Sequence, residues 1–245
     1  MRAFLFGALL AAAAMAQAAE ITVFSSNAMK SVLEELVPQF EKSTGHKVTV
    51  SFAPAQELKG RIDKGEAFEV AILTAALMDE LAKDKRIAGI SRTAVAKAGA
   101  GVAVRKGAPK PDLATAESFK SALLAAKSVA YVGAGATGAN IRGIFERFGI
   151  AEEMKAKTKL LSGVSAADAV AQGEAELGFT MISEILPVAG AELAGPLPPE
   201  VQVYTVFPAA MSSSSREPAA AYAFVRFLKT PEAVKVIREK GMEPG

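Results

Sequence analysis

Residues 21–40 read Ile-Thr-Val-Phe-Ser-Ser-Asn-Ala-Met-Lys-Ser-Val-Leu-Glu-Glu-Leu-Val-Pro-Gln-Phe. The first four are β-branched or aromatic and predict a short strand, and the Ser-Ser-Asn that follows predicts a loop. Apolar side chains then recur at spacings of three and four, at Met29, Val32, Leu33, Leu36, Val37 and Phe40. This spacing predicts an amphipathic helix over 28–41 whose apolar face packs on a sheet.

The same order of strand, loop and helix recurs along the chain. Strands are expected at 48–52, 70–73, 101–104, 128–132 and 177–180, and helices at 57–64, 76–83, 118–126, 140–148 and 166–172. Nearly continuous apolar strands that alternate with helices indicate parallel sheets covered by helices on both faces. We therefore expect an α/β fold of two doubly wound lobes with a ligand cleft between them.

The last third of the chain indicates how the lobes are connected. A loop is expected at 194–199 and a long alternating strand at 201–207, which is a candidate for the return crossing between the lobes. Two helices, 218–228 and 231–240, follow it. Because no low-complexity linker separates the two series, we expect two chain crossings. Lobe 1 should comprise 20–100 and 206–245, and lobe 2 should comprise 101–205.

The N-terminal residues indicate export. Arg2 precedes an uncharged, alanine-rich stretch that ends in Ala16-Gln17-Ala18, so we expect a signal peptide, 1–19, that is cleaved. A membrane anchor is the less favoured alternative, because the stretch falls short of the roughly 20 strongly apolar residues that a spanning helix needs. The chain has no cysteine, so the mature protein should carry no disulfide and no lipidated cysteine, and its expected location is the periplasm.

Composition also bears on partners and chemistry. The formal net charge is +2 without a block of like charges, which gives little support to nucleic-acid binding. His46 is the only histidine and lies in a polar stretch, where a solvated loop is expected. A metal site with two histidines is therefore excluded, and neither a metal nor a cofactor is expected.

The expected ligand site lies where the carboxyl ends of the strands and the starts of the helices converge. The candidate residues at these points are mostly small or hydroxyl-bearing, and they are Ser25, Ser26, Asn27, Gln56, Thr74, Thr137, Gly138 and Thr180. Hydroxyl groups and free N–H groups at helix starts suit a small anion. The alternative for each hydroxyl is that it only caps its own helix. Arg105 is the charged candidate for a carboxylate, and Tyr131 is a further residue within reach.

The loop after the strand at 128–132 also matches a dinucleotide-binding pattern. Gly133, Gly135 and Gly138 have the spacing G-x-G-x-x-G. The acidic residues that follow at the required distance, Glu152 and Glu153, lie in a charged helix and do not end a second strand. Close backbone approach to a small ligand is the favoured interpretation.

Three segments resemble the molybdate-binding-protein family of periplasmic solute-binding proteins, which serve ABC importers. They are 21–30, 170–178 (Val-Ala-Gln-Gly-Glu-Ala-Glu-Leu-Gly) and 218–232 (Pro-Ala-Ala-Ala-Tyr-Ala-Phe-Val-Arg-Phe-Leu-Lys-Thr-Pro-Glu). The resemblance implies the type II periplasmic binding-protein fold, a monomer, a small anionic ligand and an ABC permease as partner. Of the family's hydroxyl ligands, it carries over Ser25 or Ser26.

Two loops depart from that family. Its second loop reads Gly-Ala-Ser-Gly, whereas 53–56 here is Ala-Pro-Ala-Gln, and Thr180-Met181 stands where the family has a tyrosine. We therefore expect molybdate to bind with a dissociation constant of at least ~10 µM. The chain is also similar to the aconitate isomerases built on the same fold. That resemblance implies an unsaturated tricarboxylate and a base, for which Glu184 is the nearest acidic residue to a site loop. The sequence thus favours an anion-binding protein of an importer, with an isomerase as the alternative.

Overall fold

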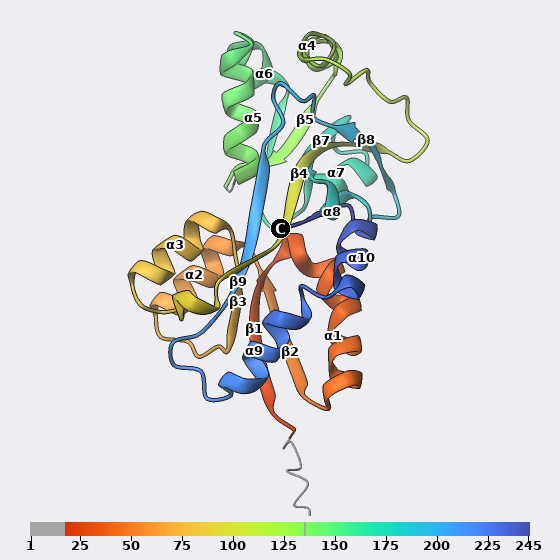
Figure 1. Cartoon of the computed structure of the whole chain (residues 1–245). Coiled ribbons are helices and arrows are strands. Elements are labelled where there is room, and N and C mark those ends of the chain that lie inside the picture. Colours follow the sequence, from red (N-terminus) through yellow and green to blue (C-terminus); the bar gives the residue numbers. More distant parts are fainter. Residues whose placement is uncertain (1–17, 135) are drawn as a thin grey trace, which may run out of the picture.

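The computed structural model describes residues 18–134 and 136–245 as two lobes joined through a narrow middle (Figure 1). Most of the expected signal peptide lies outside these residues. In the described part of the chain, no helix is long and apolar enough to cross a membrane.

The lower lobe in Figure 1 is built on a mixed sheet with the order β2-β1-β3-β9-β4. Strands β1, β2 and β3 run parallel to one another, and β9 and β4 run antiparallel to their neighbours. The bounds are β1 Glu20–Ser26, β2 Lys47–Ala53, β3 Val70–Ile72, β4 Thr93–Arg105 and β9 Tyr204–Met211. A short last strand, β10 (Glu243–Pro244), pairs with β4.

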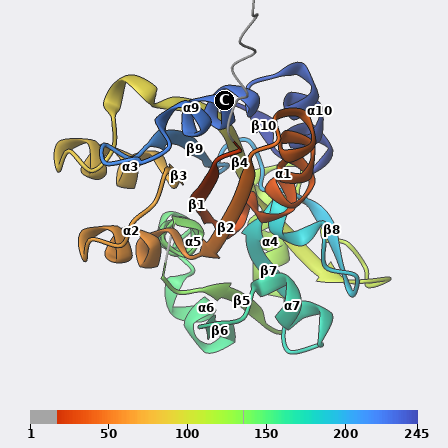
Figure 2. The same cartoon turned by 90° about the horizontal axis from the view of Figure 1, so that it is seen from below.

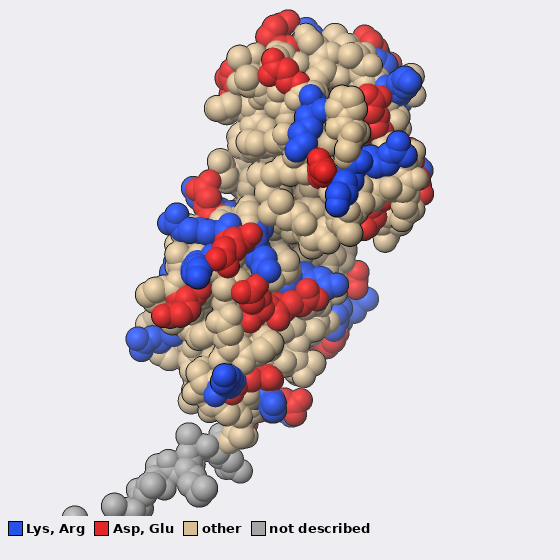
Figure 3. All heavy atoms as spheres, turned by 90° about the vertical axis from the view of Figure 1, so that its right-hand side faces the viewer, with Lys and Arg blue, Asp and Glu red and all other residues tan. Residues whose placement is uncertain are grey.

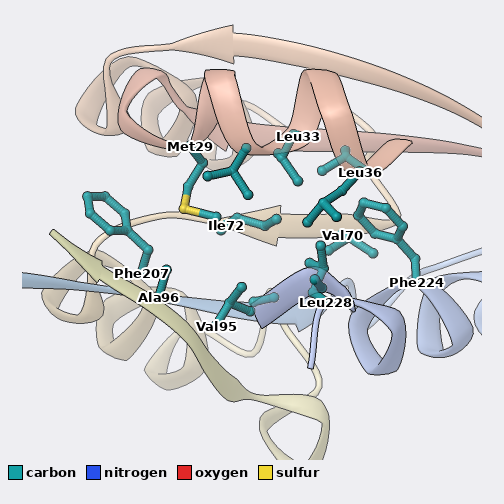
Figure 4. Close-up of a cluster of buried hydrophobic side chains, with 14 of the residues drawn as sticks. Met29, Leu33, Leu36, Val70, Ile72, Val95, Ala96, Phe207, Phe224 and Leu228 are labelled. Carbon is teal, nitrogen blue, oxygen red and sulfur yellow. The ribbon is translucent and has the colours of Figure 1, made fainter. Parts of the chain in front are cut away.

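Helices cover both faces of this sheet (Figure 2). One face carries α1, α9 and α10, and the other carries α2 and α3. Successive strand residues serve opposite faces: Val23 packs under α1, whereas Phe24 packs under α2 and α3. Figure 4 shows side chains of α1, β3, β4, β9 and α9 meeting in the core between the sheet and α1, α9 and α10, which we call the first core. The bounds are α1 Lys30–Thr44, α2 Ala55–Asp63, α3 Ala75–Lys83, α9 Pro218–Phe227 and α10 Pro231–Glu239, with 3-10 turns η1 Asn27–Met29 and η2 Gly89–Ser91.

The upper lobe continues the sheet through β4 in the order β4-β7-β5-β6, with β8 also paired to β4. Strands β5, β6 and β7 are parallel. Their bounds are β5 Val129–Val132, β6 Thr158–Leu161, β7 Leu177–Met181 and β8 Ala191–Pro196. The helices are α4 Ala116–Ala125, α5 Ala136–Arg147, α6 Ala151–Lys157, α7 Ala166–Ala171 and α8 Ile182–Ile185. This is the expected α/β arrangement in two lobes.

Two strands cross between the lobes. Strand β4 pairs with β9 over Thr93–Gly99 and then with β7 over Ala100–Ala103. The strand expected at 101–104 is thus the end of a longer one, and the strand expected at 201–207 begins at Tyr204. The proposed lobe boundaries at 100/101 and 205/206 both fall inside these strands and stay a prediction.

The prediction of a loop at 194–199 is wrong for its first three residues, because β8 extends to Pro196. Its partner is β4, with a register shift between Val102 and Ala103. A bulge of this kind bends an edge strand and admits residues that disfavour regular pairing. This is how Gly195 and Pro196 are accommodated in β8.

His46 is half-buried, and the expected solvated position is wrong. Its Nδ1 accepts a hydrogen bond of 3.1 Å from the Ala19 N–H, and its ring stacks on Phe40 with 5.9 Å between centroids. These contacts fix the first residue before β1. They place the histidine at the amino end of β1, opposite the end that carries Ser25 and Ser26.

Charged side chains of both signs are interspersed over both lobes on the face shown in Figure 3. The surface narrows between the lobes on the same face. In every ion pair of the described chain at least one side chain is exposed, so these pairs contribute little stability individually.

Candidate functional site

The carboxyl ends of β1, β2 and β3 form one edge of the lower lobe. Register aligns Ser26 with Ala53 of β2 and Ser25 with Ile72 of β3. The loops and helix starts that follow these strands therefore lie side by side. The structure brings five of the expected residues to this edge, and they are Ser25, Ser26, Asn27, Gln56 and Thr74.

These five residues differ in accessibility. Ser25 is fully buried, and Ser26 keeps 8% of its surface exposed. Thr74 is half-buried, whereas Asn27 and Gln56 are exposed. The Ser25 hydroxyl makes one long contact, at 3.3 Å from the carbonyl oxygen of Ser26. A buried hydroxyl with so weak a partner is costly unless something else pairs with it.

The hydroxyls at this edge do not cap their helices. Ser26 precedes η1 and Thr74 precedes α3, yet neither side chain accepts a hydrogen bond from the first turn. Pro54, which precedes α2, has no hydroxyl to offer. The capping explanation for Ser26 and Thr74 is therefore wrong, and the donors of these helix starts remain available to an anion.

Elsewhere the same residue types do cap. Thr115 accepts a 3.1 Å hydrogen bond from the Ser118 N–H, and Ser165 accepts one of 3.0 Å from the Asp168 N–H. Thr230 does the same for α10, at 3.3 Å. The chain thus uses its hydroxyls as caps away from the edge and leaves them uncommitted at the edge.

The upper lobe presents a second edge of the same kind. Register aligns Tyr131 of β5 with Phe179 of β7, so the carboxyl ends of these parallel strands coincide. Thr137, in the first turn of α5, follows β5, and the buried Thr180 lies near the end of β7. Both strand ends face the narrow middle of the molecule (Figure 1).

The two edges touch at one point. The Ser183 hydroxyl of α8 donates a 3.0 Å hydrogen bond to the carbonyl oxygen of Ala28 in η1. Met181, at the end of β7, packs in the first core of the lower lobe. The loop that begins at Ser25 and the loop that follows Thr180 are therefore neighbours across the lobes.

Gly138 is buried and has a packing role. A Cβ atom at this position would collide with the carbonyl oxygen of Val132 in β5. The close approach that this glycine permits is thus between α5 and its own preceding strand. Packing of that kind explains the third glycine of the Gly133–Gly138 pattern without a dinucleotide.

Arg105 does not join the others. It pairs with Ala191 of β8, four residues along β4 beyond Gly101, which is the partner of Thr180. At ~3.3 Å per strand residue this distance is about 13 Å, in the direction away from the lower lobe. Arg105 lies beyond the start of β7, beside Gly173, and the expected contact with a carboxylate ligand is not supported by this position.

Tyr131 belongs to the upper core. It is 3% exposed, and its ring meets Phe145 edge-on with 6.2 Å between centroids. Burial raises the pKa of the Tyr131 phenol above its ordinary value, and the Arg142 guanidinium opposes that rise. Tyr131 therefore has a packing role in the upper core, and its contact with a ligand stays a prediction.

Arg142 is a cation that the sequence pattern did not single out. From the second turn of α5, its Nη1 donates a 2.8 Å hydrogen bond to the carbonyl oxygen of Gly133. The side chain is exposed and is held beside the glycine loop. The only signal in the sequence was its position on the polar face of the helix, five residues after Thr137.

Glu184 lies next to Thr180 at the upper edge. The Thr180 hydroxyl donates a hydrogen bond to Oε2 of Glu184, and the Met181 N–H lies 3.4 Å from the same oxygen. Burial raises the pKa of the Glu184 carboxyl above its ordinary value, and these two hydrogen bonds oppose the rise. A carboxyl group whose pKa is raised by burial is a stronger base when it is ionised.

Two surface hollows lie apart from these edges. One, of about 620 Å³, lies between Pro111–Ala114 and the segment from Ala194 to Tyr204. The other, of about 530 Å³, lies on the lower lobe between η2 and α9. Among the residues that the structure describes, no three His, Asp or Glu side chains come together as they would around a metal ion.

Comparison with known proteins agrees with this architecture. A relative from Pseudomonas sp., an aconitate isomerase, is 33% identical over 97% of this chain and 94% of its own. A molybdate-binding protein of Azotobacter vinelandii is 30% identical over 94% of this chain and 92% of its own. The solved Azotobacter vinelandii periplasmic molybdate-binding protein superposes with a TM-score of 0.77 at 23% identity, covering 92% of this chain and 99% of that one.

The family model described as bacterial extracellular solute-binding protein matches residues 21–243. That range takes in both lobes and both strands that cross between them. This chain belongs to the bacterial extracellular solute-binding proteins.

Proposed function

We propose that the protein binds a small organic anion with two or three carboxylates between its lobes. The observation that carries this proposal is that Ser26 and Thr74 stand at adjacent helix starts without capping them. Helix starts with free N–H groups stabilise negative charge without a full counter-charge. Two such groups on one lobe and Thr137 on the other suit a ligand with more than one carboxylate.

Molybdate is the less favoured ligand. A tetrahedral oxyanion needs short donors that converge on four oxygens, and here the second loop offers Pro54 and the longer, exposed Gln56. Each missing donor costs about 1 kcal/mol, and more when the acceptor is a desolvated charge. We expect molybdate to bind with a dissociation constant of at least ~10 µM, which corresponds to about −7 kcal/mol.

Calorimetric titration of molybdate, cis-aconitate, trans-aconitate and citrate into one preparation tests both statements. A carboxylate should bind more tightly than molybdate. Ser26→Ala combined with Thr74→Ala should weaken carboxylate binding by about 10-fold or more, because two uncommitted hydroxyls are lost. Nanomolar binding of molybdate would reverse the choice of ligand.

A matched control is available in the chain. Thr115→Ala removes a hydroxyl that does cap a helix and lies away from both edges. It should lower thermal stability and leave the affinity unchanged. If Thr115→Ala and the Ser26/Thr74 double variant changed the affinity equally, the assigned edge would be wrong.

A second candidate function is isomerisation of an unsaturated tricarboxylate. Two observations favour it: the 33% identity with an aconitate isomerase over nearly the whole chain, and the partly buried Glu184 beside Thr180. Incubation with cis- or trans-aconitate, followed by proton NMR, would detect the other isomer. If the carboxylate binds and no isomer forms at high protein concentration, binding alone is the function.

The cellular setting follows from the binding proposal. A binding protein of this family would reach the periplasm through a cleaved signal peptide, work as a monomer and deliver its ligand to an ABC permease. Ligand-dependent pull-down of membrane fractions by the purified protein would test the permease. Size-exclusion chromatography with light scattering would test the monomer.

A further inference from the structure

Glu184 caps the start of α8, where its side chain and the Met181 N–H form part of a capping box, and its carboxylate is buried in doing so. It is in the first turn of α8, which has only four residues, Ile182–Ile185. Its carboxylate accepts hydrogen bonds only from Thr180 and from the neighbouring Met181 N–H among the contacts of the described chain. In the part of the chain that the structure describes, no charged side chain shifts the pKa of this carboxyl, so it has no counter-ion there to compensate its burial.

Glu184 is next in sequence to a residue that joins the two lobes. Its neighbour Ser183 donates to the carbonyl oxygen of Ala28, which directly follows Asn27 at the lower edge. The other neighbours on α8, Ile182 and Ile185, face Gly101 of β4. Since Ile182 and Ile185 share one side of this helical turn, the side chain of Glu184 projects from the opposite side.

We propose that Glu184 is the base that moves the proton in an allylic isomerisation of a bound unsaturated tricarboxylate. This inference rests on the second candidate function. Glu184 takes a proton from the methylene carbon next to the double bond. The C–H electron pair then forms the new double bond, and the π electron pair of the former double bond moves to the carbon at its far end. The protonated Glu184 returns the proton to that far carbon.

The surroundings suit this step. No oxidant or co-reactant is needed, because one proton leaves a carbon and one proton arrives at another. A proton that resides on Glu184 exchanges with solvent before it is returned, which introduces deuterium in D2O. Negative charge develops on the substrate while the proton resides on Glu184. The uncommitted donors at Ser26 and Thr74 stabilise such charge when they are already oriented toward it. Thr180 holds the carboxylate in place through its hydroxyl.

Other titratable groups fit the role less well. His46 is held at the amino end of β1, and Tyr131 is packed in the upper core. Glu57, in the first turn of α2, is exposed and would carry its charge in water. A base in water gains nothing from burial, whereas a desolvated carboxylate is a stronger base.

The test uses Glu184→Gln, which keeps the shape of the side chain and removes its capacity to take a proton. Wild-type protein in D2O should convert cis- and trans-aconitate into each other and introduce deuterium, as seen by proton NMR. Glu184→Gln should slow both processes by about 100-fold or more. Its affinity for trans-aconitate, measured by calorimetry, should stay within about fivefold of the wild-type value.

Glu184→Asp and Glu146→Gln complete the design. The aspartate retains the base at a shorter reach and should keep part of the activity, which shows that loss in Glu184→Gln is chemical. Glu146 is an exposed residue of α5, and its replacement makes the same charge change without an effect on turnover.

The outcomes separate the inference from the proposed function. Wild-type turnover with an unimpaired Glu184→Gln overturns the assignment and leaves the isomerase standing. Binding without turnover or deuterium uptake in the wild type overturns both the isomerase and the assignment of Glu184. Loss of binding in Glu184→Gln also overturns the assignment, because it would make Glu184 a binding residue.

Discussion

Some hydroxyl side chains in this chain cap a helix, and others stand at a helix start without capping it. Replacing the first kind should lower stability, whereas replacing the second kind should affect stability much less. Thr115 caps α4 by accepting a hydrogen bond from the Ser118 N–H, and its own N–H donates to the Ser118 hydroxyl in return. Thr115→Ala should therefore cost about 1 kcal/mol. For a protein of this size that corresponds to a fall in melting temperature of about 2–4 °C. Thermal unfolding followed by circular dichroism provides the measurement.

Thr74→Ala is the matched variant for Thr115→Ala, because Thr74 stands at a helix start without capping it. It should change the melting temperature of the unliganded protein by less than half as much as Thr115→Ala. Equal losses in the two variants would mean that the Thr74 hydroxyl is committed to the fold after all.

Glu184 should make stability depend on pH. Its pKa is raised in the folded chain, mainly by burial, so the folded protein holds this proton more tightly than the unfolded chain does. The favourable contribution is complete below the unfolded pKa and is lost as the pH rises through the folded pKa. Glu184→Gln should therefore be more stable than wild type at pH 8 and should lose that advantage at pH 4.

Urea unfolding of both proteins at the two pH values measures this difference. A constant difference between them would contradict the assigned burial of the carboxylate. A buried carboxylate that costs stability when it is ionised is consistent with the proposed role, because active sites commonly retain such groups.

At the scale of helices and strands, the sequence predicted an element correctly where its local pattern and its tertiary contacts favour the same structure. The first strand and helix follow from the β-branched and aromatic run at 21–24 and from the apolar spacing after it, and α7 differs from the expected helix by one residue. The loop expected to begin at Ser25 is wrong over its first two residues, because β1 continues through Ser26. The sheet edges and most candidate hydroxyls followed from the same pattern, because parallel strands bring their carboxyl ends together.

Other features depend on partners that are distant in sequence. Strand β8 contains Gly195 and Pro196 and forms only because β4 lies beside it. Strand β4 is itself rich in alanine and glycine, and its pairing with β9 makes it a strand. Local propensity disfavours both strands, and tertiary pairing overrides it. Arg105 was misplaced for a related reason: its distance from Thr180 depends on the register between β4 and β7.

The start of α5 yields a prediction about two glycines in one helix. A Cβ at Gly138 would collide with the Val132 carbonyl oxygen, whereas a Cβ at Gly143 would meet nothing within 4 Å. Gly138→Ala should therefore cost about 2–3 kcal/mol, because rigid backbone must move. Gly143→Ala should stabilise the protein by ~0.5–1 kcal/mol through helix propensity.

Chemical denaturation of the two alanine variants tests the packing role of Gly138. If Gly138→Ala were tolerated as well as Gly143→Ala, α5 would not rest on β5 as closely as described. The close approach would then be open to a ligand, as the glycine pattern first suggested.

At the scale of the whole molecule, one side chain links the two strands that cross between the lobes. The Gln202 amide accepts a 3.0 Å hydrogen bond from the Ala100 N–H and donates one of 2.9 Å to the Ala100 carbonyl oxygen. Ala100 is the residue at which β4 leaves β9 and joins β7, and Gly99 and Gly101 flank it. The glutamine thus provides a backbone-like rung where the main-chain ladder changes partner.

Gln202→Ala should loosen the connection between the lobes. It removes three hydrogen bonds, two with Ala100 and one accepted from the Val203 N–H, each worth about 1 kcal/mol. The glycines that flank Ala100 allow wide backbone angles. Hydrogen exchange of residues 98–103 should accelerate, while exchange in β1 and β5 should stay unchanged. Gln39→Ala, at an exposed position of α1, is the control and should alter neither.

Gln202→Ala should also weaken ligand binding, although it changes no residue at the two sheet edges. A ligand held by both lobes binds only the arrangement in which the edges face each other, so its apparent affinity scales with the population of that arrangement. If Gln202→Ala lowers this population tenfold, the carboxylate should bind about tenfold more weakly, with the loss absent from Gln39→Ala. Faster exchange at 98–103 with an unchanged affinity would show that the contact between Ser183 and Ala28, and not the glutamine, holds the lobes in their binding arrangement.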